Sequence, residues 1–429
     1  MAKSVQSFDE YADLVRKSGI VEKNRLEAIL SAFEQMPEGR PSDSFILAKR
    51  LMEDKLVTPW QNSHLLGGRS KGFFLGKYKL LNFLGTGGMS TVYLAEHIMM
   101  RRQVAIKVLL GAQVEQSRLE RFHRECRAIA GLDHPNIVRA HDFDSDGKFH
   151  YLVMEFVEGC DLQSLVEKQG PLPHAEAADY IRQAADGLQH AHEAGMIHRD
   201  IKPANLLRDA KGVIKILDMG VARITNRDEV SLTLAGDEGM LGTVDYLSPE
   251  QALDSHNVDV RADIYSLGCT LYFLLTGNPP FSTGTQAQRL LAHQVQQPKA
   301  VSEIRQDVPS ALIDICNRMI AKKPDDRYQT AGEVSRALAS RSNGDSTARE
   351  ENTSVIEASQ SSSQQRTSAA STDTEVNSQQ KTLAKIDGSV RTACTGCGAQ
   401  FKAPSSAIGK RVRCPRCQAV FPVTASDPE

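Results

Sequence analysis

The spacing of hydrophobic residues changes along this 429-residue chain, from short segments typical of β-strands to longer stretches with helical spacing. This change most constrains the fold. Longer helical patterns, with one apolar stripe at 174–192 and an almost wholly apolar stretch at 261–276, come late. Before them come short β-rich segments, at 78–84, 91–96, 103–109 and 150–155. The region 78–338 therefore predicts an α+β fold with two lobes, a small β-rich lobe followed by a larger helical lobe, and a cleft between them.

A helical module is expected before this region, in residues 1–72. Polar and apolar positions alternate there at helical spacing. Thr58, Pro59 and Gly67 are the residue types expected at the N-cap, the first turn and the end of a short helix. The module carries no chemical motif, so it is either a structural extension that packs on its neighbour or a binding site for a protein partner.

Composition argues against several classes of partner. The chain has 51 Lys plus Arg against 53 Asp plus Glu, so its formal net charge of -2 offers no strong attraction to nucleic acid or to a membrane surface. The run of low charge at 264–275 is shorter than the roughly 20 apolar residues that span a bilayer. Residues 1–10 lack the apolar core of a secretory signal. We therefore expect a cytoplasmic protein, in which four scattered cysteines are reduced interior thiols: Cys126, Cys160, Cys269 and Cys316.

A glycine-rich sequence joins the first two predicted strands. Glycines let a hairpin bend closely over a ligand and expose backbone N–H groups to phosphates. A hairpin without a ligand is the alternative, and a dinucleotide-binding motif would need a helix after the glycines, where this chain has a strand. The residues expected to contact a nucleotide here are Leu84, Gly85, Thr86, Gly87, Gly88, Met89, Ser90 and Val92.

The next predicted strand carries a lysine. A period of two places Ala105 and Lys107 on one face, where the small alanine leaves room for a flat base and the ammonium group can pair with phosphates. Such a lysine needs an anion to hold it, and Glu125, on the helical stretch 118–129, is the best candidate. Taken singly, both residues would be interpreted as ordinary surface charges.

The most specific string follows the long helical stretch and reads His198-Arg199-Asp200-Ile201-Lys202-Pro203-Ala204-Asn205. Asp200 can accept a hydroxyl proton, and Lys202 can neutralise charge on a transferred group. Asn205 can supply one oxygen to Mg²⁺ (or Mn²⁺), and Asp218 can supply another. Together with the upstream lysine and glutamate, this order of residues predicts transfer of the terminal phosphoryl group of ATP to a hydroxyl.

Residues 78–338 resemble the eukaryotic-type (Hanks-type) serine/threonine protein kinases, and more closely their bacterial members. The resemblance implies the bilobal protein-kinase fold and ATP-dependent phosphorylation of Ser or Thr in protein substrates, with autophosphorylation, in cytoplasmic signalling. It also implies that Met154–Val157 is the hinge that holds adenine, so Glu155 and Val157 join the nucleotide site.

The resemblance further implies contacts that hold the site in place. Glu250 would close the activation segment and pair with Arg327, and Asp263 would brace the catalytic loop. As a further hypothesis, a phosphate on the activation segment would engage Arg199 and order that segment. The candidate acceptors are Thr225, Ser231, Thr233 and Thr243.

Two positions depart from the family's pattern. Ser90 replaces the third glycine of the phosphate loop, and Met219 replaces the usual phenylalanine after the metal-binding aspartate. Neither change removes a charge needed for catalysis. A catalytically silent pseudokinase scaffold stays open as an alternative that loss of a catalytic residue would have favoured. A small-molecule kinase of related fold is disfavoured by 242–250, which in the family shapes the platform for a polypeptide substrate.

Two Cys-x-x-Cys pairs lie near the C-terminus, sixteen residues apart, which is the spacing of a four-thiolate zinc site: Cys394, Cys397, Cys414 and Cys417. The surrounding residues 388–426 hold six basic residues and no acidic one, which offsets the charge of about -2 on such a centre. We therefore expect residues 390–424 to form a zinc ribbon with a structural Zn²⁺, although the basic residues could instead contact nucleic acid or an acidic protein. The intervening residues 341–388 are polar, contain no aromatic residue and predict a disordered linker. Nothing in the sequence specifies an oligomeric state.

Overall fold

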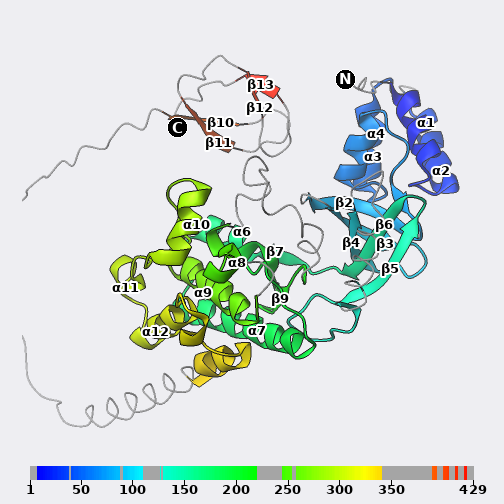
Figure 1. The fold of residues 1–429 in the computed structure, drawn as a ribbon. Helices are drawn as coiled ribbons and strands as arrows, with labels where there is room; N and C mark the ends of the chain where they lie inside the picture. Colours follow the sequence, from blue (N-terminus) through cyan, green and yellow to red (C-terminus); the bar gives the residue numbers. More distant parts are fainter. Residues whose placement is uncertain are drawn as a thin grey trace, which may run out of the picture. The chain divides into compact units, whose positions relative to one another are not determined.

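The computed structural model describes residues 7–37, 40–86, 90–109, 126, 129–219, 244–253 and 258–340, and the backbone of four short strands after residue 388. The chain forms two compact units, Met1–Ser359 and Gln360–Glu429 (Figure 1). Among the described residues, no helix combines the length and the hydrophobicity that spanning a bilayer requires.

Helices occupy the described part of the N-terminal region: α1 (Phe8–Ser18), α2 (Lys23–Glu34), α3 (Ser44–Glu53) and α4 (Pro59–Leu66). Their apolar stripes meet in one buried cluster, which includes Tyr11, Val15, Leu26, Leu47 and Leu65. The α4 helix begins at the residues that the sequence indicated. Thr58 is its N-cap and accepts a hydrogen bond from the Gln61 N–H at 3.2 Å, Pro59 follows in the first turn, and Gly67 is the C-cap.

The small lobe contains an antiparallel sheet with the strand order β1-β2-β3-β4-β6-β5. Its strands are β1 (Phe74–Leu75), β2 (Tyr78–Thr86), β3 (Ser90–His97), β4 (Gln103–Leu109), β5 (Ala140–Asp146) and β6 (Phe149–Glu155). The four strands predicted from the sequence are confirmed, whereas β1 and β5 were not predicted. The β5 sequence contains three aspartates, which strands disfavour, and its pairing with β6 overrides that preference.

The two faces of β4 belong to different cores. Val104, Ile106 and Val108 pack in the cluster on one face of the sheet. Ala105 packs in the large cluster that extends through the helical lobe, so the alternation predicted for this strand is confirmed. Lys107, two residues along from Ala105, is buried on the same face.

The larger lobe is helical: α6 (Leu162–Gln169), α7 (His174–Glu193), α8 (Pro249–Leu253), α9 (Arg261–Thr276), α10 (Gln286–Val295), α11 (Val301–Ile304) and α12 (Ser310–Met319). A small antiparallel sheet joins it, formed by β7 (Gly159–Asp161), β8 (Leu206–Asp209) and β9 (Ile214–Ile216). Every residue of α9 from Ala262 to Thr276 is buried, as its all-round apolar pattern predicted.

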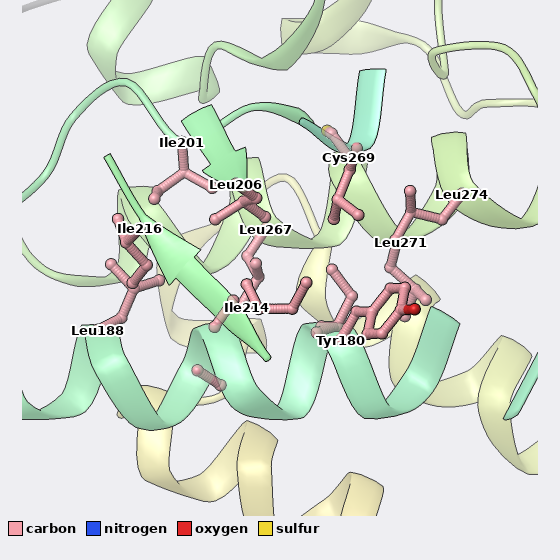
Figure 2. Close-up of a cluster of buried hydrophobic side chains, with 14 of the residues drawn as sticks. Tyr180, Leu188, Ile201, Leu206, Ile214, Ile216, Leu267, Cys269, Leu271 and Leu274 are labelled. Atoms are coloured by element: carbon pink, nitrogen blue, oxygen red, sulfur yellow. The ribbon is translucent and has the colours of Figure 1, made fainter. Parts of the chain in front are cut away.

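The core of this lobe fixes the segments on either side of the loop 198–205. Figure 2 shows Leu188 of α7 and Ile216 of β9 in the same apolar cluster as Leu267 of α9. The α7 stripe predicted from the sequence is confirmed, with all its members buried: Ala177, Ile181, Ala184, Leu188 and Ala191. The loop is therefore held at both ends by a packed interior, which restricts its movement.

The second unit shows two hairpins in its described backbone. β10 (Ser389–Ala393) pairs with β11 (Gln400–Pro404), and β12 (Arg411–Arg413) pairs with β13 (Val420–Pro422). The four cysteines of the predicted zinc site and the predicted linker 341–388 lie outside the described residues. In the described part of the chain, Cys126, Cys269 and Cys316 are buried and Cys160 is half-buried.

Candidate active site

Lys107 of β4 and Asp218, which follows β9, form an ion pair. The lysine Nζ lies 2.6 Å from Oδ1 of Asp218, and the lysine side chain is only 5% exposed. Burial by itself would raise the pKa of Asp218, but the charge of Lys107 and its hydrogen bond outweigh burial and bring that pKa below its ordinary value. The carboxylate is therefore ionised at neutral pH, as a ligand for a divalent cation must be.

Asp200, Lys202 and Asn205 are brought together in the loop between α7 and β8. Nζ of Lys202 lies 2.9 Å from Oδ2 of Asp200. The Asn205 amide donates to the Asp200 carbonyl oxygen at 2.7 Å and to its Oδ2 at 3.0 Å. Oδ1 of Asp200 is buried and has no hydrogen-bond partner among the described residues. A carboxylate oxygen without a partner, beside a cation, has the chemistry that a proton acceptor requires.

The loop 198–205 is tied to the segment that carries Asp218. Nε2 of His198 lies 2.7 Å from the Leu217 carbonyl oxygen. The Leu217 N–H donates to the Asn205 carbonyl oxygen at 2.9 Å. These contacts bring Asn205 and Asp218 into neighbouring positions. Two oxygen ligands suit Mg²⁺, which usually takes its other ligands from phosphate and water.

A buried carboxylate braces the same loop. Asp263, in the first turn of α9, is fully buried and accepts hydrogen bonds from the backbone N–H groups of His198 at 2.8 Å and Arg199 at 2.7 Å. Nε2 of His192 contacts its Oδ2 at 2.8 Å. Burial alone would raise the pKa of Asp263, yet the hydrogen bond from His192 and the nearby histidine charges bring it below the ordinary value. The bracing contact expected from the resemblance is confirmed.

Two residues of the site adopt left-handed backbone conformations, although neither is glycine. Arg199 has φ = 64° and Asp218 has φ = 55°. Such conformations cost about 1–3 kcal/mol each and persist only where surrounding contacts impose them. Asp263 supplies those contacts for Arg199. Strain of this kind concentrates at functional sites, which agrees with the placement of these two residues.

Comparison with known proteins now identifies the family. The sequence profile of the protein kinase domain matches residues 78–338. The chain belongs to the protein kinase family. It is 40% identical over 264 residues to serine/threonine-protein kinase PknB of Mycobacterium leprae, covering 60% of this chain and 42% of that protein. It is 38% identical over 260 residues to serine/threonine-protein kinase PrkC of Bacillus subtilis, covering 60% of this chain and 39% of that protein. The chain thus matches about two fifths of the length of these curated relatives.

The kinase domain also contains the predicted pair between the end of the activation segment and the helical lobe. Nη1 and Nη2 of Arg327 lie 2.7 and 2.8 Å from the two carboxylate oxygens of Glu250. The arginine is fully buried. This pair, expected from the resemblance, is confirmed.

Several residues expected to contact adenine are apolar and pack in one cluster. Ala105 and Met154 are buried, and Val92 and Val157 are half-buried against the same cluster. Glu155 ends β6, and its Oε1 lies 2.5 Å from Nζ of Lys215. The Glu155 side chain is thus engaged in an ion pair, and its expected contact with adenine stays a prediction.

Several expected site residues lie outside the described residues, and their roles stay predictions: Gly87, Gly88, Met89, Glu125, Thr225, Ser231, Thr233, Thr243, Cys394, Cys397, Cys414 and Cys417. The expected pair of Lys107 with Glu125 is among them. In the described part of the chain, no three His, Cys, Asp or Glu side chains cluster as a metal site.

Sequence reasoning missed His192 as a partner of Asp263, since its place at the end of the α7 stripe gave no sign of a distant carboxylate.

Proposed function

We propose that this chain is an ATP-dependent protein kinase that phosphorylates Ser or Thr residues of protein substrates, including its own, in cytoplasmic signalling. The observation that carries the proposal is the grouping of Lys107, Asp200, Asn205 and Asp218 around two braced loops, with one Asp200 oxygen available as a base. The names of the two curated relatives support serine/threonine specificity. Lys202 followed by Pro203, which resembles the serine/threonine branch of the family, adds to that support.

In the proposed mechanism, Asp200 orients the substrate hydroxyl and accepts its proton as the oxygen attacks the terminal phosphorus of ATP. The bond from that phosphorus to the bridging oxygen breaks, and ADP leaves. Lys202 offsets charge on the transferred group, and Lys107 binds the phosphates together with the backbone N–H groups of the glycine-rich hairpin. Asn205 and Asp218 would hold Mg²⁺ or Mn²⁺. When bound, the ion neutralises charge on the phosphate oxygens.

The test is incubation with labelled ATP and Mg²⁺ and a generic protein substrate, comparing the wild-type chain with Asp200→Asn. We expect the rate of label transfer by the variant to be about 10²–10⁴-fold lower, which is the usual contribution of a positioned base. Asp325→Asn is the matched control, because Asp325 is 89% exposed and lies outside the site. Undiminished labelling by Asp200→Asn would refute the assignment of the base. A wild-type protein that binds ATP but transfers no label would instead support the scaffold alternative.

We further propose that Cys394, Cys397, Cys414 and Cys417 bind one structural Zn²⁺ in a C-terminal ribbon. The support is their spacing, together with the position of each Cys-x-x-Cys pair between the two strands of a hairpin in the sequence. Four protein ligands would leave no open position for catalysis. The basic residues of this unit then serve to balance the charge of the thiolates.

A further inference from the structure

The α4 helix lies against β2, the strand next to the edge strand β1 of the kinase sheet. The Thr58 hydroxyl donates to the Leu81 carbonyl oxygen at 2.5 Å. The Gln61 amide donates to the Leu80 carbonyl oxygen at 2.6 Å, and Gln61 is fully buried. Figure 1 shows α4 beside β2, consistent with these bonds. Two side chains of the helical module thus supply donors to two successive backbone groups of β2.

These bonds meet β2 at a bulge. Leu80 pairs with Ala95 of β3 and Asn82 pairs with Leu94, so Leu81 has no partner residue in the ladder. On the other side, β1 pairs with β2 only as far as Lys79. A bulge bends its strand and increases the local twist, and its unpaired backbone groups need other partners. Thr58 supplies such a partner to the Leu81 carbonyl oxygen, and Gln61 supplies one to the carbonyl oxygen of the preceding residue, Leu80.

The same two side chains also cap the helix. Oγ1 of Thr58 accepts from the Gln61 N–H at 3.2 Å, and Oε1 of Gln61 accepts from the Thr58 N–H at 3.0 Å. This reciprocal pair is a capping box. The start of α4 and the bulge of β2 therefore share the side chains that bind them, and displacement of one disturbs the other.

Aromatic rings extend the contact along the sheet. The Trp60 ring of α4 lies 5.8 Å from the ring of Tyr93 in β3, and the Tyr93 ring lies 6.1 Å from that of Phe83 in β2. In addition, Nζ of Lys79 donates to the Ile20 carbonyl oxygen at 2.8 Å. The module thus contacts both strands that carry the glycine-rich hairpin.

We infer that Thr58 and Gln61 are positioning residues for nucleotide binding, acting through the β2 bulge on the hairpin that covers the ATP phosphates. Gly85 lies four residues beyond Leu81, about 13 Å along an extended strand. A bend at the bulge therefore changes the direction in which β2 leads to the glycines. The inference rests on the proposed function, and it gives the helical module a role in ATP affinity.

The test separates the helix cap from the contact with the strand. Thr58→Asp keeps an oxygen that caps α4 but removes the hydroxyl donor to Leu81, whereas Thr58→Ser keeps both. We expect Thr58→Asp to raise the KM for ATP and the Kd for a fluorescent ADP by up to about fivefold, the factor reached if the whole net energy of one hydrogen bond is coupled to nucleotide binding, with kcat unchanged. Thr58→Ser should match the wild type. Gln61→Glu, which keeps the capping oxygen and loses the donor to Leu80, should raise both constants as well.

The matched control is Thr285→Asp. Thr285 caps α10 with the same capping box, formed with Gln288, in the helical lobe. It should leave the KM for ATP unchanged. Lower melting temperatures with unchanged KM and Kd in Thr58→Asp and Gln61→Glu would overturn the inference, because the contact would then be structural only. An equal rise of KM in Thr285→Asp would overturn it too. If the wild-type protein binds no nucleotide, the proposed function fails together with this inference. If the wild-type protein binds nucleotide and the variants bind it equally well, only this inference fails.

Discussion

Arg327 uses all of its donors in the interior of the helical lobe. A guanidinium group has five N–H donors in a fixed fork. Nε donates to the Ala321 carbonyl oxygen at 2.7 Å. Nη1 and Nη2 bind the two oxygens of Glu250, and they also donate to the carbonyl oxygens of Arg261 and Lys322, each at 2.9 Å. The side chain has no exposed surface. Five donors thus meet five acceptors.

The replacement Arg327→Lys keeps the charge but offers only three donors. At least two of the five acceptors are then left without a partner, at about 1–3 kcal/mol each. Glu250 is 22% exposed, so water relieves part of that cost at the carboxylate. We therefore expect Arg327→Lys to lower the free energy of unfolding by about 3 kcal/mol. Arg327→Met, which strips the carboxylate of its cation, should cost about 3–5 kcal/mol.

Urea unfolding followed by far-UV circular dichroism measures the effect. The midpoint should fall with an unchanged slope, and the melting temperature should fall by roughly 10 °C for a domain of this size. Asp325→Asn is the control, because its pair with Arg261 at 2.7 Å lies at the surface and should contribute less than about 1 kcal/mol. If Arg327→Lys costs less than the control, the argument from donor count is wrong.

Three further predictions concern catalysis, pH and metal. Lys107→Met should reduce label transfer from ATP by at least about 10²-fold, and a wild-type rate would exclude its phosphate role. Burial, aided by the charge of Lys322, lowers the pKa of His293 from 6.5 to about 3. The folded state keeps the His293 ring neutral, whereas the unfolded state protonates it below pH 6.5. The contribution of this group to the free energy of unfolding is therefore complete above pH 6.5 and is lost as the pH drops toward 3, by up to about 5 kcal/mol. His293→Gln should flatten this pH dependence of urea unfolding; an unchanged slope contradicts the assignment. Atomic emission should find one zinc per chain, lost in Cys394→Ser but retained in Cys160→Ser, and metal-free wild-type protein would exclude the zinc site.

Much of the fold could be predicted from local sequence patterns. The alternation in β4, the stripe of α7 and the cap of α4 each depend on residues within a few positions of one another, so they can be identified along the chain. The β5 strand could not be identified from the sequence, because its aspartates disfavour a strand and only its pairing with β6 makes this segment extended. The order of the catalytic residues was recognisable for the same reason as the helices: each motif is short and has a characteristic spacing.

What the sequence by itself determined is which residue types are present, on which kinds of element, and hence the chemistry they can perform. The tertiary structure alone decided which of them meet. Lys107 and Asp218 are separated by 111 positions, Arg199 and Asp263 by 64, and Arg327 and Glu250 by 77. The bond from Thr58 to the Leu81 bulge is equally invisible in either segment alone. The physical reason is that periodicity and capping arise from local backbone geometry, whereas these contacts depend on how separate elements pack around a shared core.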